Sequence, residues 1–427
     1  MVLERKFESD VQLIKYEVLK EVAKLAMDGT LEEKKDGIPF IIDPGPAPRI
    51  RCCIYKEREI TKERVKLAMG GNKSNRNVIE VIEVACDECP VDRFIVTEAC
   101  RGCLAHRCSE ACPRGAIYHI GGRSHIDQEK CIECGKCKEA CPYNAIADVM
   151  RPCKKACSAD AIYFDSNTKK AMIDNEKCIR CGACIIQCPF GAIMDKSFIV
   201  DIIELLKESQ KNDDFHVYAA IAPAIASQFT YASIEQVVCG IKELGFYDVI
   251  EVALGADMVA LHETNELVET VDDKGFLSTS CCPAFVSYIQ NNYPMLKDNI
   301  SNTVSPMIAI ARLIKHIDPK AKVVFIGPCV AKKNEILLDD LKDDVNFVMT
   351  FEELAAMLDA ANIDLENCND GALNNASYYG RIFARSGGVT EAVEHVIDIH
   401  DIDIDFKPIK CNGIKECDKA LKMAKVN

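Results

Sequence analysis

Apolar residues recur every three or four positions near the N-terminus, a spacing that places them on one face of a helix. This pattern predicts an amphipathic helix over residues 11–27. The apolar positions that define it are Val11, Ile14, Val18, Val22 and Leu25. A shorter segment of the same kind predicts a helix over residues 60–69. The start of the chain is therefore expected to be helical.

Beyond residue 196 the pattern alternates between two periods. Short apolar runs rich in β-forming residues predict strands over residues 216–222 and 322–326. Helical spacing predicts helices over residues 234–244 and 352–361. Because alternating strands and helices pack as a sheet covered by helices, we expect an α/β fold for this part of the chain.

The middle of the chain contains an internal repeat. In each copy a cysteine is followed four residues later by the pair Ala-Ile. The copies begin at Cys112, Cys141, Cys157 and Cys188. Their alanines are separated by 29, 16 and 31 residues, so two long gaps flank a short one. This spacing predicts two domains of two repeats each, since one repeat is too short to enclose a core by itself.

Cysteine is unusually frequent, at 25 of 427 residues, and 16 of the 25 lie between residues 86 and 188. In that segment the spacing Cys-x2-Cys-x2-Cys-x3-Cys-Pro occurs twice, and a third copy has two extra residues in its second gap. The runs comprise Cys131, Cys134, Cys137 and Cys141, then Cys178, Cys181, Cys184 and Cys188, and, with the longer gap, Cys100, Cys103, Cys108 and Cys112. This is the ligand spacing of bacterial 4Fe-4S ferredoxins.

Zinc sites and disulfide bonds are the competing uses of so many cysteines. Zinc ribbons use CxxC pairs that are a dozen or more residues apart, rather than runs closed by Cys-Pro. Disulfide scaffolds are typical of short secreted chains, whereas this chain is long and its N-terminus carries no apolar signal segment. We therefore expect iron–sulfur clusters in a cytoplasmic protein.

In two-cluster ferredoxins the fourth cysteine of each run ligates the other cluster. This rule assigns two ligand sets to the first domain, one of Cys100, Cys103, Cys108 and Cys141, the other of Cys131, Cys134, Cys137 and Cys112. In the second domain it combines Cys157 with Cys178, Cys181 and Cys184. The remaining cysteines, either a fourth set or the remnant of a lost one, are Cys86, Cys89, Cys153 and Cys188. Pairing of the 131 run with the 178 run, with residues 150–165 as an insert, is also open.

Charge and hydropathy narrow the possible partners. The chain has 52 Lys and Arg against 66 Asp and Glu, and this formal net charge of −14 disfavours binding to a phosphate backbone. No run of 18 uncharged apolar residues occurs, so we expect no membrane-spanning helix. Neither a nucleic acid nor a membrane is expected as a partner.

Two further motifs lie in the α/β part. They read Thr-Ser-Cys-Cys-Pro-Ala-Phe at residues 279–285 and Gly-Pro-Cys-Val-Ala-Lys-Lys-Asn-Glu at residues 327–335. Downstream of a ferredoxin array, they resemble the first two signature motifs of the di-iron (FeFe) hydrogenases, and the resemblance runs from the ferredoxin repeats to residue 427. Phe285 and the segment CNGIKEC at residues 411–417 resemble the clostridial side branch of that family.

The resemblance implies a fold, a reaction and a set of partners. It implies α+β ferredoxin-like iron–sulfur domains followed by an α/β hydrogenase catalytic domain, and the reaction 2H⁺ + 2e⁻ ⇌ H₂. The family's H-cluster is a 4Fe-4S cubane joined to a di-iron site that carries CO, cyanide and a dithiolate amine. A ferredoxin-like electron carrier and the H-cluster maturation proteins are the implied partners.

The same resemblance implies roles for individual residues. Cys282 and Cys329 match two ligands of the cubane, and Cys281 matches the thiol that relays protons. Lys332 matches a lysine that pairs with a cyanide ligand. The other implied residues are Glu263, Glu266 and Ser301 of a proton route, and Ala222, Pro223 and Pro328 around the di-iron pocket.

These observations predict four parts, a helical region at residues 1–85, ferredoxin-type 4Fe-4S domains at 86–149 and 150–195, and a hydrogenase catalytic domain at 196–427. The family's third motif, which supplies two more cysteines to the cubane, has no match up to Asn427. Cys411 and Cys417 precede the expected place and are six residues apart, so we do not assign them as substitutes.

We therefore expect a polypeptide ending at Asn427 to hold three or four ferredoxin-type clusters, and to form an H-cluster only if its C-terminus is completed. A non-catalytic iron–sulfur protein, serving as an electron carrier or redox sensor on a hydrogenase-like scaffold, is the alternative. A zinc-binding module is a more distant one.

Overall fold

The computed structural model describes residues 7–211, 214–368, 371–373 and 375–424. The N-terminal helices are α1 (Asp10–Met27), α2 (Leu31–Lys34), α3 (Ile38–Ile42) and α4 (Ile54–Ala68). Helix α1 confirms the predicted amphipathic helix, and its N-terminus is capped by the Ser9 hydroxyl, which accepts from the Gln12 amide. Helix α4 begins six residues before the predicted segment, because its first turns are mostly charged and polar and carry no apolar periodicity.

Short antiparallel strand pairs form the cysteine-rich segment. The pairs are β1 (Ile79–Val81) with β8 (Ile193–Asp195), β2 (Phe94–Val96) with β5 (Ile146–Asp148), β3 (Ile117–Ile120) with β4 (Arg123–Ile126), and β6 (Ile162–Phe164) with β7 (Ala171–Ile173). One-turn helices lie between them, α5 (Arg107–Glu110), α6 (Lys136–Ala140), α7 (Pro152–Ala156) and α8 (Ala183–Gln187).

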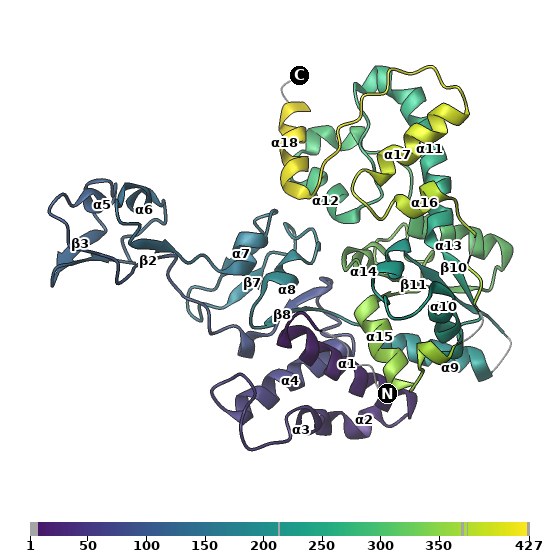
Figure 1. Cartoon of the computed structure of the whole chain (residues 1–427), viewed down its shortest axis with the longest axis horizontal. Helices are drawn as coiled ribbons and strands as arrows, with labels where there is room; N and C mark the ends of the chain where they lie inside the picture. The colour runs from purple at the N-terminus through teal and green to yellow at the C-terminus, as the bar shows by residue number, and fades with distance from the viewer. Residues whose placement is uncertain (1–6, 212–213, 369–370, 374, 425–427) are drawn as a thin grey trace.

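The pairing divides this segment into two similar bodies. Strands β2 to β5 all lie in sequence between β1 and its partner β8. We call residues 90–150 the outer cysteine domain, and residues 78–89 together with 151–195 the inner cysteine domain. Figure 1 shows the outer domain projecting at one end of the molecule, with the inner domain between it and the rest of the chain.

The C-terminal part is built on a parallel sheet of order β10-β9-β11-β12. Its strands are β9 (Val217–Ile221), β10 (Asp248–Glu251), β11 (Lys322–Gly327) and β12 (Phe347–Thr350). The central strands are buried on both faces and carry continuous apolar runs, as parallel sheets require. The predicted α/β fold is confirmed, and β9 and β11 coincide with the two predicted strands.

Helices cover the sheet and extend beyond it (Figure 1). They are α9 (Ile199–Lys211), α10 (Ile234–Glu243), α11 (Val252–Lys274), α12 (Pro283–Asn292), α13 (Pro306–Ile317), α14 (Ala331–Glu335), α15 (Phe351–Ala360), α16 (Tyr378–Ile382), α17 (Gly388–Ile399) and α18 (Ile414–Ala424). Short 3₁₀ turns occur at Lys35–Gly37, Glu83–Ala85, Pro223–Ser227, Pro294–Asn299 and Leu365–Asn367. Within the described ranges no helix is both long and apolar enough to span a bilayer.

A buried ion network joins the N-terminal helix, the inner cysteine domain and the sheet domain. Lys333 Nζ, in α14, is fully buried and lies 2.8 Å from Asp195 Oδ2 and 2.7 Å from Glu353 Oε1. Lys15 Nζ, in α1, lies 2.9 Å from Asp195 Oδ1 and 2.8 Å from Glu352 Oε2. Asp195 ends strand β8, so one carboxylate holds three separate parts of the chain together.

Both the carboxyl groups and the lysines of this network are ionised. Burial alone would raise the pKa of Asp195, but the ammonium groups of Lys15 and Lys333 outweigh it and hold that pKa well below its ordinary value. Burial would likewise lower the pKa of Lys333, and the carboxylates of Asp195 and Glu353 raise it instead. Removal of one partner therefore leaves an uncompensated buried charge.

We predict that Lys333→Met lowers the free energy of unfolding by about 3–5 kcal/mol, because the Asp195 and Glu353 carboxylates lose their shared cation. The control is Lys66→Met, which breaks an exposed pair with Glu63 in α4 and should cost no more than about 0.5 kcal/mol. Anaerobic urea unfolding followed by circular dichroism measures both variants. Equal stability of the two variants would show that the network does not hold the domains together.

Candidate functional site

In the outer cysteine domain, each of the two crossed ligand sets surrounds a cavity of its own. One cavity is lined by Cys112, Cys131, Cys134 and Cys137. The other is lined by Cys100, Cys103, Cys108 and Cys141. The fourth cysteine of each run thus faces the three leading thiols of the other run. This arrangement has the donor chemistry and the crossed pairing of a two-cluster ferredoxin.

The inner cysteine domain repeats this arrangement near the sheet domain. Burial raises the pKa of Cys181, and the neighbouring thiols of Cys157 and Cys178 raise it further. Burial also raises the pKa of Cys184, with the same neighbours adding to the effect. We call Cys157, Cys178, Cys181 and Cys184 the inner thiol set. Sulfur ligands packed so closely are stable as thiolates only when a metal neutralises them.

The Cys-x3-Ala repeat has a direct physical cause. In every copy the backbone N–H of the alanine donates to the sulfur of the cysteine four residues before it, at 3.2–3.4 Å. The cysteine–alanine pairs are Cys112–Ala116, Cys141–Ala145, Cys157–Ala161 and Cys188–Ala192. Each alanine is nearly inaccessible, so the position has no room for a larger side chain. The repeat therefore marks sulfurs that receive an amide hydrogen bond.

The inner thiol set packs against the loop that follows β11. Gly182 has φ +77°, and a Cβ at this position would lie 3.5 Å from the side chain of Val330. Cys157 and Cys178 share an apolar cluster with Cys329 and Phe285. The inner thiol set and the two motifs at residues 279–285 and 327–335 therefore meet at one interface.

Cys282 and Cys329, the thiols of the two motifs at residues 279–285 and 327–335, come from separate parts of the sheet domain. Cys282 precedes α12 as its N-cap, and Cys329 lies between β11 and α14, at the carboxyl end of the sheet. Burial raises the pKa of Cys329, and Cys282 raises it further. Opposing this, the Lys332 ammonium and the amides of Ala331 and Lys332 favour the Cys329 thiolate. Ligands of α/β sheets commonly bind at this edge.

Cys281 and Lys332 lie beside these thiols. Burial raises the pKa of Cys281 to about 12, with Glu263 and Cys282 acting in the same direction and Lys332 against it. Lys332 Nζ is buried, donates to the Cys281 carbonyl at 3.2 Å and pairs with Glu335 Oε2 at 2.7 Å. A buried ammonium thus faces the backbone of the first motif.

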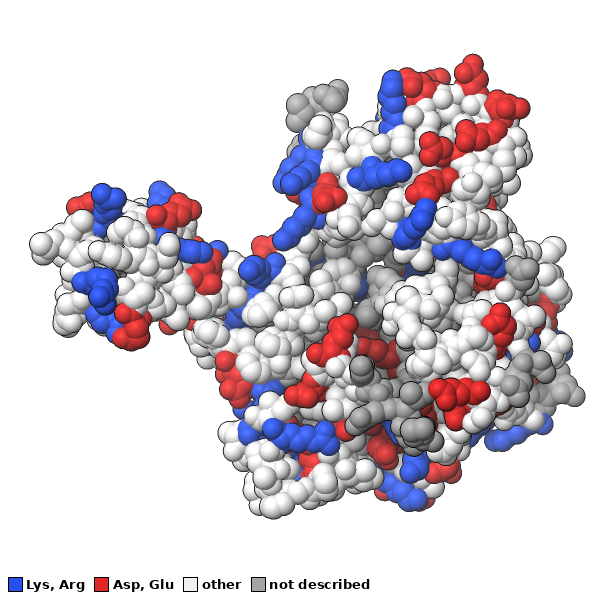
Figure 2. All heavy atoms as spheres, in the orientation of Figure 1, with Lys and Arg blue, Asp and Glu red and all other residues white. Residues whose placement is uncertain are grey.

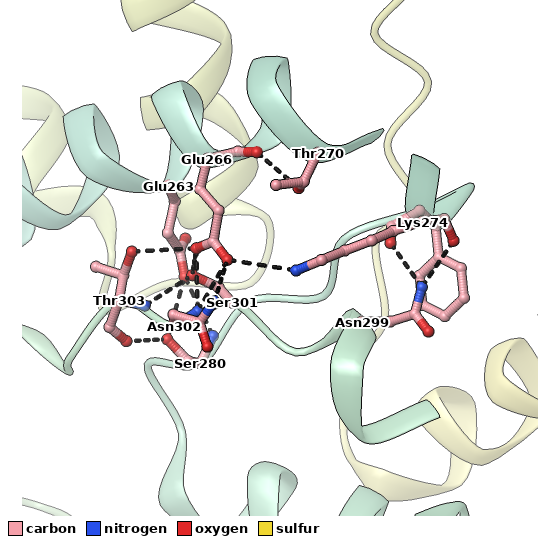
Figure 3. A network of polar contacts seen from close by, with 10 residues as sticks. Glu263, Glu266, Thr270, Lys274, Ser280, Asn299, Ser301, Asn302 and Thr303 are labelled. Atoms are coloured by element: carbon pink, nitrogen blue, oxygen red, sulfur yellow. Dashed lines mark hydrogen bonds and ion pairs between the residues drawn. The ribbon is translucent and has the colours of Figure 1, made fainter. Parts of the chain in front are cut away.

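The carboxylates of the expected proton route form one connected network (Figure 3). The Ser280 amide donates to Glu263 Oε1 at 3.1 Å. Ser301 Oγ donates to Glu266 Oε2 at 2.6 Å. Burial raises the pKa of the Glu263 carboxyl, and the Ser280 amide and the Ser301 hydroxyl lower it in part. Lys274 Nζ lies 3.6 Å from Glu266 at the outer end. Both glutamates are on α11, so a single helix positions the route.

The strand ends supply the pocket residues that the resemblance implied. Ala222 follows β9 and donates its amide to the Ile326 carbonyl of β11, which brings Pro223 and Pro328 to the same edge of the sheet. A Cβ on Gly327 would lie 2.5 Å from the Phe325 ring and 3.2 Å from the Ala222 Cβ. The packing of Phe325 thus requires glycine at position 327.

A thiol that we had not assigned also reaches this region. Tyr288 and Tyr293 donate to Asp418 Oδ1 at 2.8 and 2.6 Å, which docks α18 on α12. Burial raises the pKa of Cys417, in α18, to about 11, and Cys411 and Cys282 raise it as well. The spacing of Cys411 and Cys417 gave no signal of this proximity, because it depends on how two distant helices pack.

Two protein-family models match parts of this chain. The family described as "Iron only hydrogenase large subunit, C-terminal domain" matches residues 215–427, and the "4Fe-4S binding domain" matches residues 124–147 and 171–194. The chain is an FeFe-hydrogenase-like protein with ferredoxin-type domains.

Two curated relatives extend this family assignment along the chain. "Iron hydrogenase 1" of Clostridium pasteurianum is 30% identical over 350 residues, which are 74% of this chain and 60% of the relative. The "Periplasmic [Fe] hydrogenase large subunit" of Nitratidesulfovibrio vulgaris is 29% identical over 321 residues, covering 68% of this chain and 73% of the relative. The chain thus spans less than two thirds of the clostridial relative.

A solved [FeFe]-hydrogenase structure, that of HydA(deltaEFG), is 22% identical to this chain, with a TM-score of 0.41. The match covers 49% of this chain and 60% of that chain. The family models and the curated relatives assign this chain to the FeFe-hydrogenase-like proteins.

We predict a pH-dependent effect of Glu263→Gln on stability. Burial, with help from Glu266, raises the pKa of Glu263 to about 7, so between pH 4.5 and 7 the folded chain binds a proton that the unfolded chain releases. Stability therefore falls as the pH rises through this range, and Gln removes that loss. From pH 5.5 to 8 the stability of Glu263→Gln should rise relative to wild type by about 2 kcal/mol.

The matched control is Glu269→Gln, an exposed position on the same helix, whose stability should parallel that of wild type at every pH. Anaerobic urea unfolding at three pH values measures the three proteins. Parallel curves for Glu263→Gln and wild type would show that the Glu263 carboxyl is ionised in the folded chain at pH 5.5.

Proposed function

We propose that this protein is a di-iron hydrogenase that interconverts protons and electrons with H₂, linked to a ferredoxin-like carrier by its cysteine domains. The observation that supports it is the meeting of two routes at Cys281, Cys282 and Cys329. The inner thiol set packs in one apolar cluster with Cys329, and the Glu263–Glu266 network reaches Cys281. A site with both an electron and a proton supply suits the reaction 2H⁺ + 2e⁻ ⇌ H₂.

The electron side of the site rests on packing. Gly182 lies in sequence between Cys181 and Cys184 of the inner thiol set. A Cβ at this position would be in van der Waals contact with Val330, which adjoins Cys329 in the chain. Val330 also packs in the apolar cluster of the inner domain that contains Cys184. A cluster held by the inner thiol set would therefore lie directly beside a cysteine of the catalytic motif.

The residues at the strand ends fit the cofactor of the resembled family. Cys282 and Cys329 are thiol donors from separate elements, and Lys332 is a buried cation beside them that can pair with an anionic ligand. When bound, an H-cluster would supply the iron centre at which protons and electrons combine. The side chains of Lys332 and Phe285 would orient it and limit the entry of water.

The proton side follows the network of Figure 3. A proton entering near Lys274 reaches Glu266, which accepts from the Ser301 hydroxyl. The Ser301 hydroxyl can pass it toward Glu263, which is buried and close enough to Cys281 to raise the pKa of that thiol. Because Glu263 has a pKa of about 7, it can gain and lose a proton near neutral pH.

The outer cysteine domain is the proposed docking end for the electron carrier. Figure 2 shows Lys and Arg side chains interspersed with Asp and Glu over this domain. Cys134 is exposed there, and Leu104, next to Cys103, is 97% exposed. A carrier that docks at this end would lie close to the clusters that the crossed thiol sets hold.

The direct test uses the complete product of the reading frame that encodes this chain, matured anaerobically with the di-iron cofactor. H₂ evolution from reduced viologen is expected only after maturation. Intact ferredoxin-type clusters without H₂ evolution would contradict the proposal and favour the non-catalytic electron carrier.

In the same preparation we predict that Glu266→Gln and Ser301→Ala each lower the rate of H₂ evolution at least about 100-fold, because each interrupts the proton route. Iron content should stay at the wild-type level, since neither residue is a metal ligand. Glu269→Gln, exposed on the same helix, is the control and should retain full activity. A variant rate within about threefold of wild type would place the proton route elsewhere.

A further inference from the structure

Three thiol sets account for 12 of the 16 cysteines in the cysteine-rich segment and leave Cys86, Cys89, Cys153 and Cys188. The inner and outer cysteine domains are similar bodies. The pair β1–β8 of the inner domain corresponds to β2–β5 of the outer one, and β6–β7 corresponds to β3–β4. Helices α7 and α8 pack together as α5 and α6 do. A ligand in one domain can therefore be matched to a position in the other.

Amide–sulfur hydrogen bonds fix the match. In the outer domain Ser124, on β4, donates its amide to the sulfur of Cys100 at 3.4 Å. In the inner domain Ala171, on the corresponding strand β7, donates its amide to the sulfur of Cys86 at 3.3 Å. Cys86 therefore occupies the place of Cys100, although it precedes the whole outer domain in the sequence.

The other three positions follow in order. Cys89 is three residues after Cys86, as Cys103 is after Cys100. Cys153 is the second residue of α7, as Cys108 is of α5. Cys188 ends its run and accepts from the Ala192 amide, as Cys141 accepts from Ala145. The ligand run of the inner domain that corresponds to Cys100–Cys108 thus begins with Cys86 and Cys89. The inserted outer domain separates these two cysteines from Cys153 in the sequence.

These four thiols lie together in the folded chain. Burial raises the pKa of Cys153 to about 11, and the thiols of Cys188, Cys86 and Cys89 raise it further. Cys86 packs against both the apolar cluster that contains Cys188 and the one that contains Cys153. Four sulfurs from three chain segments therefore converge on one place in the described structure.

Buried cations surround the same place. Arg64 is buried, its Nε has no hydrogen-bond partner in the described residues, and a Cys188 thiolate would raise its pKa, which burial lowers to about 10. Arg151, also buried, lies close enough to Cys89 to lower the pKa of that thiol. Arg51 is buried beside Arg64 and lowers the pKa of Arg64, whereas Glu57 and Asp43 raise it. The Arg51 guanidinium itself lies 3.6 Å from the Glu88 carboxylate. An anionic group among the thiols would compensate this positive charge.

We propose that Cys86, Cys89, Cys153 and Cys188 hold a fourth ferredoxin-type 4Fe-4S cluster at the root of the inserted outer domain. Four cysteines around a 4Fe-4S core carry a net negative charge, which the Arg64 guanidinium near Cys188 and the Arg151 guanidinium near Cys89 would stabilise. Cys153 also acts on the pKa of Cys184 in the inner thiol set, so the new cluster would adjoin that set. It would relay electrons between the outer domain and the inner thiol set.

The proposal does not depend on hydrogenase activity, and iron counting tests it. The full-length protein with Cys86→Ala and Cys89→Ala, reconstituted anaerobically, should contain about four fewer iron and about four fewer sulfide per chain than the control. The control carries Cys52→Ala and Cys53→Ala, a cysteine pair upstream of the site that belongs to none of the four sets. Equal iron in the two double variants would overturn the proposal.

A second measurement covers the case in which the Cys86/Cys89 variant fails to fold. In the variant with Cys282→Ala and Cys329→Ala, which removes the catalytic-motif thiols, four ferredoxin-type clusters predict about 16 iron per chain. A value of about 12, with Cys86 and Cys89 open to alkylation, would overturn the proposal. So would zinc at this site in place of iron and sulfide.

Discussion

The fold depends on one buried carboxylate, Asp195, held between two lysines from distant parts of the chain. Lys15 and Lys333 bring helix α1 and helix α14 against the last strand of the inner cysteine domain. Lys333 directly follows Lys332, so the short helix α14 turns one lysine into the ion network and the other toward the first catalytic motif. The position of the inner thiol set relative to Cys329 therefore depends on this network.

This constraint explains why the inner thiol set and the Glu263–Glu266 network meet at Cys281, Cys282 and Cys329. The inner cysteine domain has strands of three residues and a small apolar core of its own that contains Ile79, Ile162 and Ile193. Its orientation relative to the sheet domain is set by the ion pairs of Asp195 and by Val330, which packs against the apolar cluster of the inner domain. Helix α11 carries Glu263 and Glu266, whose hydrogen bonds with the Ser280 amide and the Ser301 hydroxyl hold it beside the segment that leads into Cys281.

Much of this organisation could be predicted from the sequence where the signal is local. The cysteine runs indicated the crossed ligand sets, because three of four ligands in each set come from one short segment. The strands at residues 217–221 and 322–327 and the helices α1, α10 and α15 followed from apolar periodicity. The resemblance to a known family singled out Ser301 and also Glu263 and Glu266, two residues that the pattern alone would have left as a solvated helix face.

Features that depend on long-range packing were not predictable in this way. Cys86 and Cys89 lack the rest of their run, because the outer domain separates them from Cys153 by 63 residues. Lys15 and Asp195 are 180 residues apart, and neither stands in a recognisable motif. The approach of Cys417 to Cys282 likewise depends on the docking of α18 onto α12 through Asp418.

The central claim is that an iron site with the chemistry of the resembled hydrogenases is bound where Cys282, Cys329 and Lys332 meet. Infrared spectroscopy of the matured full-length protein tests it most directly, because CO and cyanide bound to metal absorb where proteins do not. The account predicts such bands in the wild-type protein and their loss in Cys329→Ala, with the ferredoxin-type clusters intact in both. A wild-type spectrum without these bands, from protein whose ferredoxin-type clusters are complete, would contradict it.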